Sequence, residues 1–225
     1  MASSHGRFVW YELATTDFEA AKAFYTDVVG WGAHDASMPG RAYSLFTAGG
    51  ASVSGLMPLS EDARKMGLRP SWLGYVAVDD VDAAAERIKE LGGAVHVPPT
   101  DIPNISRFSV AVDPQMATIA LFKWLEGSEE QAAEVDALGR VGWHELLAAD
   151  WEKAFAFYNK LFGWEGTCRH RRGGHISAVR HWRGDDRRHA HQACDGASPV
   201  LALLLQCRRY RRRDQARRDR RRANP

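Results

Sequence analysis

The sequence predicts an α+β protein built from βαβββ modules, and two observations carry this prediction. Residues 10–31 recur 133 positions later as residues 143–164, with 11 identities in 22 positions and no gap. Each copy also has apolar residues that first alternate, as in a strand, and then recur at helical spacing. A repeat of this kind indicates that one folding unit has been duplicated.

The first copy contains the signals of one complete module. Residues 9–14 alternate like a strand, and Thr16 or Asp17 is expected to cap the next helix, because their side-chain oxygens accept the free N–H groups of its first turn. Gly30 is expected to end this helix. The next predicted strands are residues 43–47 and 51–59.

A weaker repeat predicts a second module directly after the first. Residues 71–78 read as a strand, Asp80 as a helix cap, and Gly92 with Gly93 as the helix end. Further strands are expected at residues 94–97, 107–112 and 118–123. The sequence therefore predicts one domain over residues 7–125, an acidic linker over 126–140, the start of a second domain over 141–166, and a tail over 167–225.

The charge changes sign along the chain. Residues 1–167 hold 13 Lys and Arg against 23 Asp and Glu, whereas residues 168–225 hold 17 Arg against 5 Asp. All three cysteines also lie in this tail. The part before it is expected to be cytoplasmic, since it needs no disulfides, begins with no signal peptide and contains no apolar stretch that could span a membrane.

Three motifs of the first domain resemble the vicinal oxygen chelate superfamily, which includes glyoxalase I, bleomycin-resistance proteins and extradiol dioxygenases. They are YELATTDFEAAKAFYTDVVGW, VAVDDVDAAAERIKELGG and VAVDPQMATIALF, and HELLAADWEKAFAFYNKLFGW begins a second such domain. The resemblance implies paired βαβββ modules that form a curved sheet around a cavity, followed here by a truncated second copy. The chain is most similar to two-domain, glyoxalase-like bacterial proteins.

The resemblance also implies where a metal would bind. Metal-dependent relatives place His, Gln or Glu at four strand positions that face the cavity, and the corresponding positions here are Trp10, the neighbourhood of Gly55, Leu73 and Ala120. These side chains do not offer the N, O or S ligands that a divalent metal requires. We therefore expect no metal and no other cofactor.

The candidate ligand pocket combines one carboxylate with apolar and aromatic side chains. Glu12 shares a strand face with Trp10, where it can bind a ligand donor or act as a base; the alternative is a carboxylate that is solvated or holds a backbone group. Strand alternation directs further side chains to the same cavity, although plain core packing explains them as well. They are Met57, Leu73, Tyr75 and Phe122. No residue is identified as catalytic.

His144 and Glu145 form a second pair of potential metal ligands at the start of the repeated copy. Adjacent residues of a strand point to opposite faces, so the two do not readily share one ion. His144 also aligns with Tyr11 on the face away from the cavity. We therefore do not include it among the predicted ligands.

The Arg-rich tail has three interpretations. Its Arg runs resemble a nucleic-acid-binding tract, but such tracts usually mix Lys with Arg. Its His and Cys residues lack the fixed spacing of metal sites. A frameshift between residues 164 and 177 explains more, because back-translated residues 177–192 and 198–214, read one base further along, permit sequences like those of residues 44–59 and 70–85. We therefore expect an out-of-frame, largely disordered tail.

The preferred function is metal-independent binding of a small organic molecule in the first domain. A lyase or oxygenase that needs both domains is one alternative, and nucleic-acid binding through the tail is another. The predicted partner is a small-molecule ligand, with neither membrane nor nucleic acid. A homodimer formed through the incomplete second domain stays open, because the unpaired edge of its strand could join a second chain.

Overall fold

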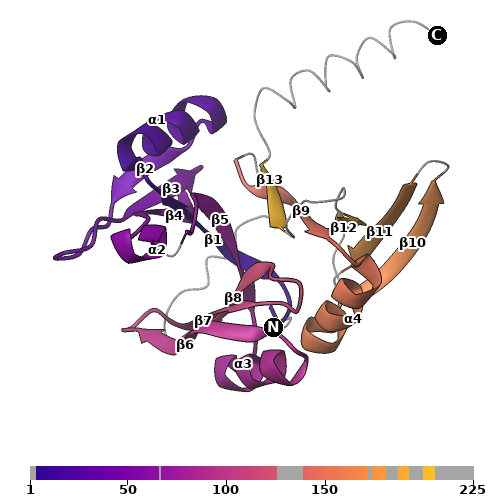
Figure 1. Ribbon diagram of the computed structural model, residues 1–225. Helices are drawn as coiled ribbons and strands as arrows, with labels where there is room; N and C mark the ends of the chain where they lie inside the picture. Colours follow the sequence, from indigo (N-terminus) through magenta and orange to yellow (C-terminus); the bar gives the residue numbers. More distant parts are fainter. Residues whose placement is uncertain are drawn as a thin grey trace, which may run out of the picture. The chain divides into compact units, whose positions relative to one another are not determined.

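The computed structural model describes residues 4–65, 67–125, 139–171, 174–180, 187–192 and 200–205 (Figure 1). The chain divides into two compact units. Unit 1 comprises Met1–Tyr11, Trp72–Glu130 and Trp143–Leu203, and unit 2 comprises Glu12–Ser71, Gln131–Gly142 and Leu204–Pro225. Most of the predicted acidic linker, residues 126–138, lies outside the described residues.

Unit 2 contains the first module from the second half of its first strand onward. Asp17 caps helix α1 by accepting a hydrogen bond from the backbone N–H of Ala20 at 3.0 Å, and Gly30 ends it in the left-handed conformation, at φ 79°. Both residues were expected in these roles from the sequence. The elements are β1 (Phe8–Thr15), α1 (Phe18–Val29), β2 (Gly32–Asp35), β3 (Ser44–Ala48), β4 (Ala51–Pro58) and α2 (Glu61–Lys65).

Unit 1 contains the second module and the start of the repeated copy. Asp80 caps α3 and Asp150 caps α4, each by accepting a hydrogen bond from a backbone N–H three residues ahead. The elements are β5 (Ser71–Ala77), α3 (Val81–Glu90), β6 (Ala94–Ile102), β7 (Ser106–Val112), β8 (Thr118–Trp124), β9 (Val141–Ala148) and α4 (Trp151–Phe162).

The strands of the two modules follow the hydrogen-bonded order β2-β3-β4-β1-β5-β8-β7-β6. The second half of β1 pairs in parallel with β4, and β5 pairs in parallel with β8. The other strands of each module pair antiparallel. The two βαβββ modules begin with β1 and β5, which are neighbours in this mixed sheet. The arrangement confirms the predicted α+β fold.

A second sheet contains the strand of the repeated copy, in the order β10-β11-β12-β9-β13. Because β12 pairs in parallel with β9, as β4 does with β1, the strand order repeats that of the first module. Beyond α4, the sequence predicts no regular structure. These strands can form because the edge of β9 offers hydrogen-bonding groups to any extended segment. The new strands are β10 (Glu165–Arg171), β11 (Gly174–Arg180), β12 (Arg187–Gln192) and β13 (Val200–Leu205).

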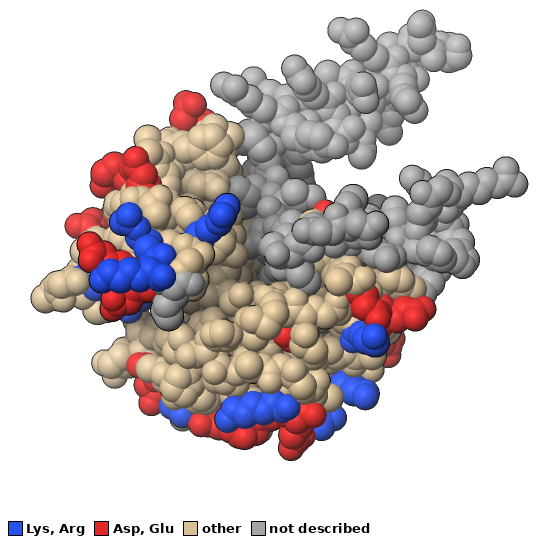
Figure 2. Space-filling model, in the orientation of Figure 1, with Lys and Arg blue, Asp and Glu red and all other residues tan. Residues whose placement is uncertain are grey.

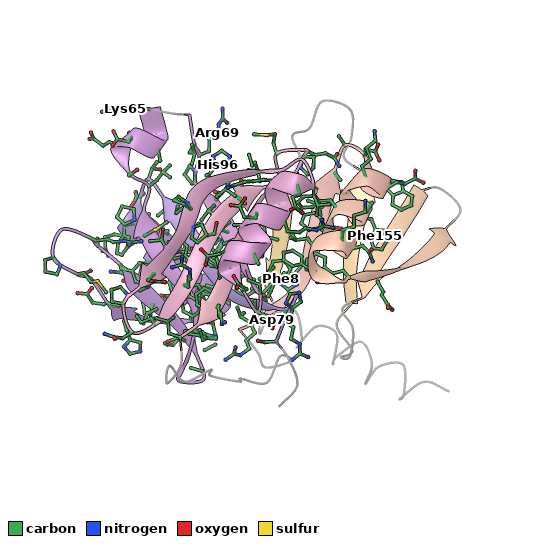
Figure 3. The ribbon with its side chains drawn as sticks, turned by 90° about the horizontal axis from the view of Figure 1, so that it is seen from below. Phe8, Lys65, Arg69, Asp79, His96 and Phe155 are labelled. Atoms are coloured by element: carbon green, nitrogen blue, oxygen red, sulfur yellow. The ribbon has the colours of Figure 1, made fainter. Side chains whose placement is uncertain are left out.

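The core of unit 1 lies where α3 and α4 pack beside each other (Figure 1). Buried aliphatic side chains of α3 meet the aromatic side chains of α4, and Phe8 and Phe155 pack against them (Figure 3). Helical spacing predicts a stripe of Val81, Ala84, Ile88 and Leu91 on α3. Val81 and Ile88 are buried together with Ala85, which was not predicted, while Ala84 and Leu91 are partly buried. The repeated copy thus has its apolar helix face buried against the second module within unit 1.

Two short elements, β2 and α2, were not predicted. The strand β6 is also longer than expected, because it continues through two prolines to Ile102 by means of register shifts against β7. No helix among the described residues is long and apolar enough to cross a membrane. On the face shown in Figure 2, acidic and basic side chains of the described residues are intermixed.

Candidate functional site

Glu12 is a buried carboxylate in the second half of β1. Its side chain is 8% exposed, and its Oε1 accepts a hydrogen bond of 2.8 Å from the hydroxyl of Tyr43, just before β3. A carboxylate withdrawn from water needs such a donor, because burial without one is costly. Glu12 is thus a buried side chain that accepts a hydrogen bond from a phenol, and its role in a ligand site stays a prediction.

The phenol of Tyr43 reaches Glu12 only because residue 55 is a glycine. Gly55 lies opposite Glu12 in the parallel pairing of β1 with β4. A β-carbon at this position would lie 2.6 Å from Tyr43 Cζ, well inside van der Waals contact. Gly55 therefore makes room for a ring that places a hydroxyl beside the carboxylate.

Two further side chains of unit 2 surround the phenol. The guanidinium carbon of Arg41 lies 6.0 Å from the centre of the Tyr43 ring, and one of its nitrogens lies 3.7 Å from the sulfur of Met57. Met57 lies two residues beyond Gly55 on β4, so the two share a strand face. We call Glu12, Arg41, Tyr43 and Met57 the carboxylate group.

Four of the predicted pocket residues belong to one apolar cluster in unit 1. Tyr75 and Phe122 are its buried centre, with ring centres 5.9 Å apart and nearly perpendicular, and Trp10 and Leu73 pack against it. Strand pairing brings them together, since Tyr75 lies opposite Ala120 in the pairing of β5 with β8. We call these residues, with Phe108 and Trp124, the aromatic group. The six predicted pocket residues thus divide into two groups, each within its own unit, and their common pocket stays a prediction.

The four positions that correspond to the metal ligands of relatives do not fit a metal. Trp10 and Leu73 offer an indole and an aliphatic side chain, while Gly55 and Ala120 offer no functional group. A divalent ion in this fold would need imidazole, carboxylate or carboxamide ligands there. Within the described residues, no group of three or more His, Cys, Asp or Glu is arranged to hold one.

His144, the equivalent of Tyr11 in the repeat, is buried in the structure. It is 6% exposed, its Nε2 lies 2.6 Å from the Tyr11 hydroxyl, and Phe8 stacks on its ring at 4.0 Å between centres. Its surroundings in unit 1 are therefore aromatic side chains rather than a set of metal ligands.

Tyr43 and Arg41 were missed by reasoning from the sequence. Arg41 precedes the strand predicted over residues 43–47 and Tyr43 begins it, and no periodic pattern there indicates that they lie beside β1. One signal was available, because a glycine inside a strand often marks a close approach by another group. Phe108 and Trp124 were also missed, although alternation along β7 and β8 places them on the face of Phe122.

The comparisons with known proteins agree with this fold. The model of the glyoxalase/bleomycin resistance protein/dioxygenase superfamily matches residues 7–121. CFP32 of Mycobacterium tuberculosis, whose name assigns it provisionally to the glyoxylases, is 38% identical over 156 residues, which cover 68% of this chain and 59% of that protein. The anthracycline biosynthesis protein DnrV of Streptomyces peucetius is 31% identical over 169 residues, covering 70% and 61%. The chain thus spans about three fifths of the length of these curated relatives.

Solved structures share the fold at low sequence identity. The Mn(II)-bound glyoxalase of Novosphingobium aromaticivorans superposes with a TM-score of 0.60 at 20% identity, covering 88% of this chain and 63% of that one. An extradiol ring-cleaving dioxygenase of B. fuscum gives a TM-score of 0.61 at 15% identity, covering 85% and 55%. Together with the matching family model and the predicted repeat of βαβββ modules, these findings show that the chain belongs to the glyoxalase/bleomycin resistance protein/dioxygenase superfamily.

Proposed function

We propose that this glyoxalase-like protein binds a small organic molecule in its first domain without a metal ion. The observation that carries the proposal is the hydrogen bond between Tyr43 and the buried Glu12, which only a glycine at position 55 permits. Specific ligand sites commonly pair an apolar lining with a few placed polar groups. The carboxylate would accept, and the phenol would donate or accept, a hydrogen bond from a hydroxyl or amino group of the ligand.

The composition of the four metal-ligand positions supports binding without a metal. A metal ion acting as a Lewis acid would need ligands at these positions, and the residues present do not supply them. They are Trp10, Gly55, Leu73 and Ala120. A lyase or oxygenase that needs both domains is the weaker alternative for the same reason. We likewise favour binding over catalysis, because the carboxylate group contains no Ser, Thr, Cys or Lys nucleophile.

The aromatic group supports a flat ligand. Within unit 1, Phe122 and Trp124 have ring centres 4.7 Å apart, and Tyr75 and Phe108 lie next to them. Aromatic faces of this kind favour aromatic partners by offset or edge contacts. The relatives named for anthracycline biosynthesis point in the same direction. The proposed ligand class is therefore a hydroxylated polycyclic aromatic compound.

A binding titration of the full chain tests this proposal. The probe is 1,2-dihydroxyanthraquinone, added in buffer with EDTA, and the readouts are tryptophan fluorescence quenching and a thermal shift. We expect saturable binding at one site, with affinity reduced about tenfold by Tyr43→Phe or Glu12→Gln, since one good polar contact is worth about 1.4 kcal/mol. The matched control Glu19→Gln alters an exposed carboxylate that pairs with Lys22, and should leave the affinity unchanged.

Two results would contradict the proposal. Affinity that is equal in the wild type, Glu12→Gln and Tyr43→Phe would exclude the carboxylate group from the site. Stoichiometric Ni, Zn, Mn or Fe in the purified protein, or ligand binding that EDTA abolishes, would exclude metal independence. Trp124→Leu tests the aromatic group separately, because its effect on affinity does not depend on the carboxylate.

The remaining expectations about partners and location keep the status of proposals. The cytoplasm is the proposed location, and a homodimer through the second copy is the proposed alternative to a monomer. The Arg runs of residues 208–222 lie outside the described residues, so a nucleic-acid role for them stays an alternative drawn from sequence alone. Affinity for nucleic acid that falls steeply with salt would support it.

A further inference from the structure

Two buried polar groups of unit 1 have no hydrogen-bond partner among the described residues. They are the hydroxyl of Ser106, a residue that is 0% exposed, and the indole N–H of Trp124. Burying a polar group without a partner is unfavourable, so such groups are few in folded proteins and each needs a physical explanation.

These two groups lie together at one end of the aromatic group. Ser106 is opposite Trp124 in the antiparallel pairing of β7 with β8, which are neighbouring strands (Figure 1). Residues opposite each other in such a pair have their side chains on one face of the sheet, with Cβ atoms about 5 Å apart. The next pair on this face is Phe108 with Phe122, both members of the aromatic group. The hydroxyl and the indole N–H therefore give the aromatic group a polar end.

A second serine of β7 shows what a paired hydroxyl looks like in the same strand. Ser109 is also 0% exposed, but its hydroxyl donates a 2.8 Å hydrogen bond to the backbone C=O of Val97 on β6. Ser109 lies three residues beyond Ser106, so the two side chains point to opposite faces of the strand. The serine that the fold leaves without a described partner is therefore the one on the face of the aromatic group.

The chemistry of the two groups defines what they can bind. An indole N–H only donates a hydrogen bond, whereas a serine hydroxyl donates or accepts. A carbonyl oxygen has two lone pairs and can accept from both, while an ammonium group offers only donors and cannot accept from the indole. We infer that Ser106 and Trp124 bind a carbonyl oxygen at the edge of the aromatic ligand. The inference rests on the proposed function, and it narrows the ligand class to quinones and aromatic ketones.

A ligand reaches these groups through side chains that are only partly buried. Trp124 is one of them, and Trp10, Leu73 and Phe108 beside it are the others. Rotamer changes of such side chains are common on binding, while the backbone moves little. The strands therefore stay paired when the ligand enters.

A buried water is the other partner that could satisfy both groups. Such a water typically makes about three hydrogen bonds to polar groups of the protein. The neighbouring side chains of Phe108 and Phe122 offer none, so a ligand carbonyl, which needs no further partner, fits this face better.

A matched pair of probes tests the inference on the full chain by isothermal titration calorimetry. Anthraquinone-2-sulfonate and anthracene-2-sulfonate share their fused rings and their sulfonate, and only the first has carbonyl groups. We expect Trp124→Phe and Ser106→Ala each to weaken binding of the quinone about tenfold, the effect of one good hydrogen bond. Binding of the hydrocarbon should change by no more than about twofold, because it makes no such bond and phenylalanine keeps an aromatic ring in place.

Two control variants and a second measurement accompany the titrations. Ser109→Ala and Trp151→Phe alter a buried serine and a partly buried tryptophan of unit 1 outside the aromatic group, and should leave both affinities unchanged. Without ligand, Ser109→Ala should lower the midpoint of thermal unfolding by at least about 2 °C, because the carbonyl of Val97 loses its donor. Ser106→Ala should not lower it, since this hydroxyl has no described partner to lose.

Three results would overturn the inference. They are an equal loss of affinity for both probes, which indicates packing; unchanged affinity for the quinone, which leaves a water as the partner; and an unfolding midpoint of Ser106→Ala that falls as far as that of Ser109→Ala. The proposed function fails separately, if the wild type binds neither these probes nor 1,2-dihydroxyanthraquinone. If Glu12→Gln and Tyr43→Phe weaken binding of 1,2-dihydroxyanthraquinone while Trp124→Phe and Ser106→Ala do not, only the inference about the carbonyl fails.

Discussion

Tyr11 and His144 are the same position of two copies of one module, and their side chains are hydrogen-bonded to each other at 2.6 Å. The ring of Phe8 stacks on His144, with 8° between the ring planes, so the pair sits among aromatic side chains. The duplication therefore appears in the structure as a contact as well as in the sequence.

The first prediction concerns this contact. Tyr11→Phe removes the hydroxyl beside His144 Nε2 and should lower the free energy of unfolding by about 1–2 kcal/mol, the usual cost of a lost buried partner. The double variant with His144→Phe should be less unstable than the sum of the two single variants, because neither polar group is then left behind. Urea unfolding of the four proteins measures the coupling, and strictly additive losses would contradict the contact.

The second prediction concerns the two indole contacts. Trp31→Phe and Trp164→Phe each keep an aromatic ring but remove the N–H donor from the carbonyls of Gly139 and Gly6. Each change should cost about 1–3 kcal/mol, since both tryptophans are buried and a carbonyl loses its partner. Thermal unfolding measures the losses. If Trp164→Phe lost stability and Trp31→Phe did not, the two equivalent indole contacts would not contribute alike to stability.

The third prediction is a pH dependence at Tyr158. Burial, and next the charge of Asp113, raise the pKa of this hydroxyl well above its ordinary value. The unfolded chain releases the proton near pH 10, whereas the folded chain keeps it, so the stabilisation is complete below about pH 10 and is lost as the pH rises toward the folded pKa. The stability advantage of the wild type over Tyr158→Phe should therefore shrink between pH 9 and 11. An advantage that stays constant over this range would contradict the raised pKa.

The fourth prediction concerns Gly55. The added methyl group of Gly55→Ala would overlap the Tyr43 ring and displace it from Glu12. We expect affinity for 1,2-dihydroxyanthraquinone to fall at least as far as in Tyr43→Phe. The double variant Gly55→Ala with Tyr43→Ala removes the overlap, and should recover most of the lost stability but not the affinity. Recovery of affinity would mean that the phenol does not bind the ligand. Differential scanning fluorimetry and the fluorescence titration separate the two effects.

The sequence predicted the elements whose signals are local. Capping by Asp17 and Asp80 and helix termination at Gly30 depend on a few neighbouring residues, and these predictions were correct. The apolar stripe predicted on α1 is not a buried face, since Phe24 is 55% and Val28 is 42% exposed. Alternation along β5 and β8 likewise predicted that Tyr75 and Phe122 share a face. The hydrogen bond from Tyr43 to Glu12 joins residues 31 positions apart. No local pattern specifies it, because it depends on the pairing of β1 with β4 and on the space above a glycine.

The strands of residues 165–205 are a case in which the structure has regular elements that the side-chain pattern did not predict. Apart from the apolar Val200–Leu205, their residues are rich in Arg and His and predict no regular structure, yet the backbone repeats the strand order of the first module. Pairing through main-chain groups does not depend on side-chain identity, so an open edge can recruit a segment whose sequence carries no strand signal. Sequencing the coding DNA of residues 164–205 decides the reading frame of this region.

The contact between Trp164 and Gly6 can form only late in the synthesis of the chain. Gly6 is among the first residues to leave the ribosome, but the indole that bonds its carbonyl belongs to Trp164. At 5–20 residues per second, roughly 8–30 seconds separate the two. During that interval both modules of the first domain are already synthesised and β1 can pair with β4 and β5, but the carbonyl of Gly6 stays exposed without its indole donor. A translational pause before residue 164 would lengthen this exposure, and faster decoding of residues 126–164 would shorten it.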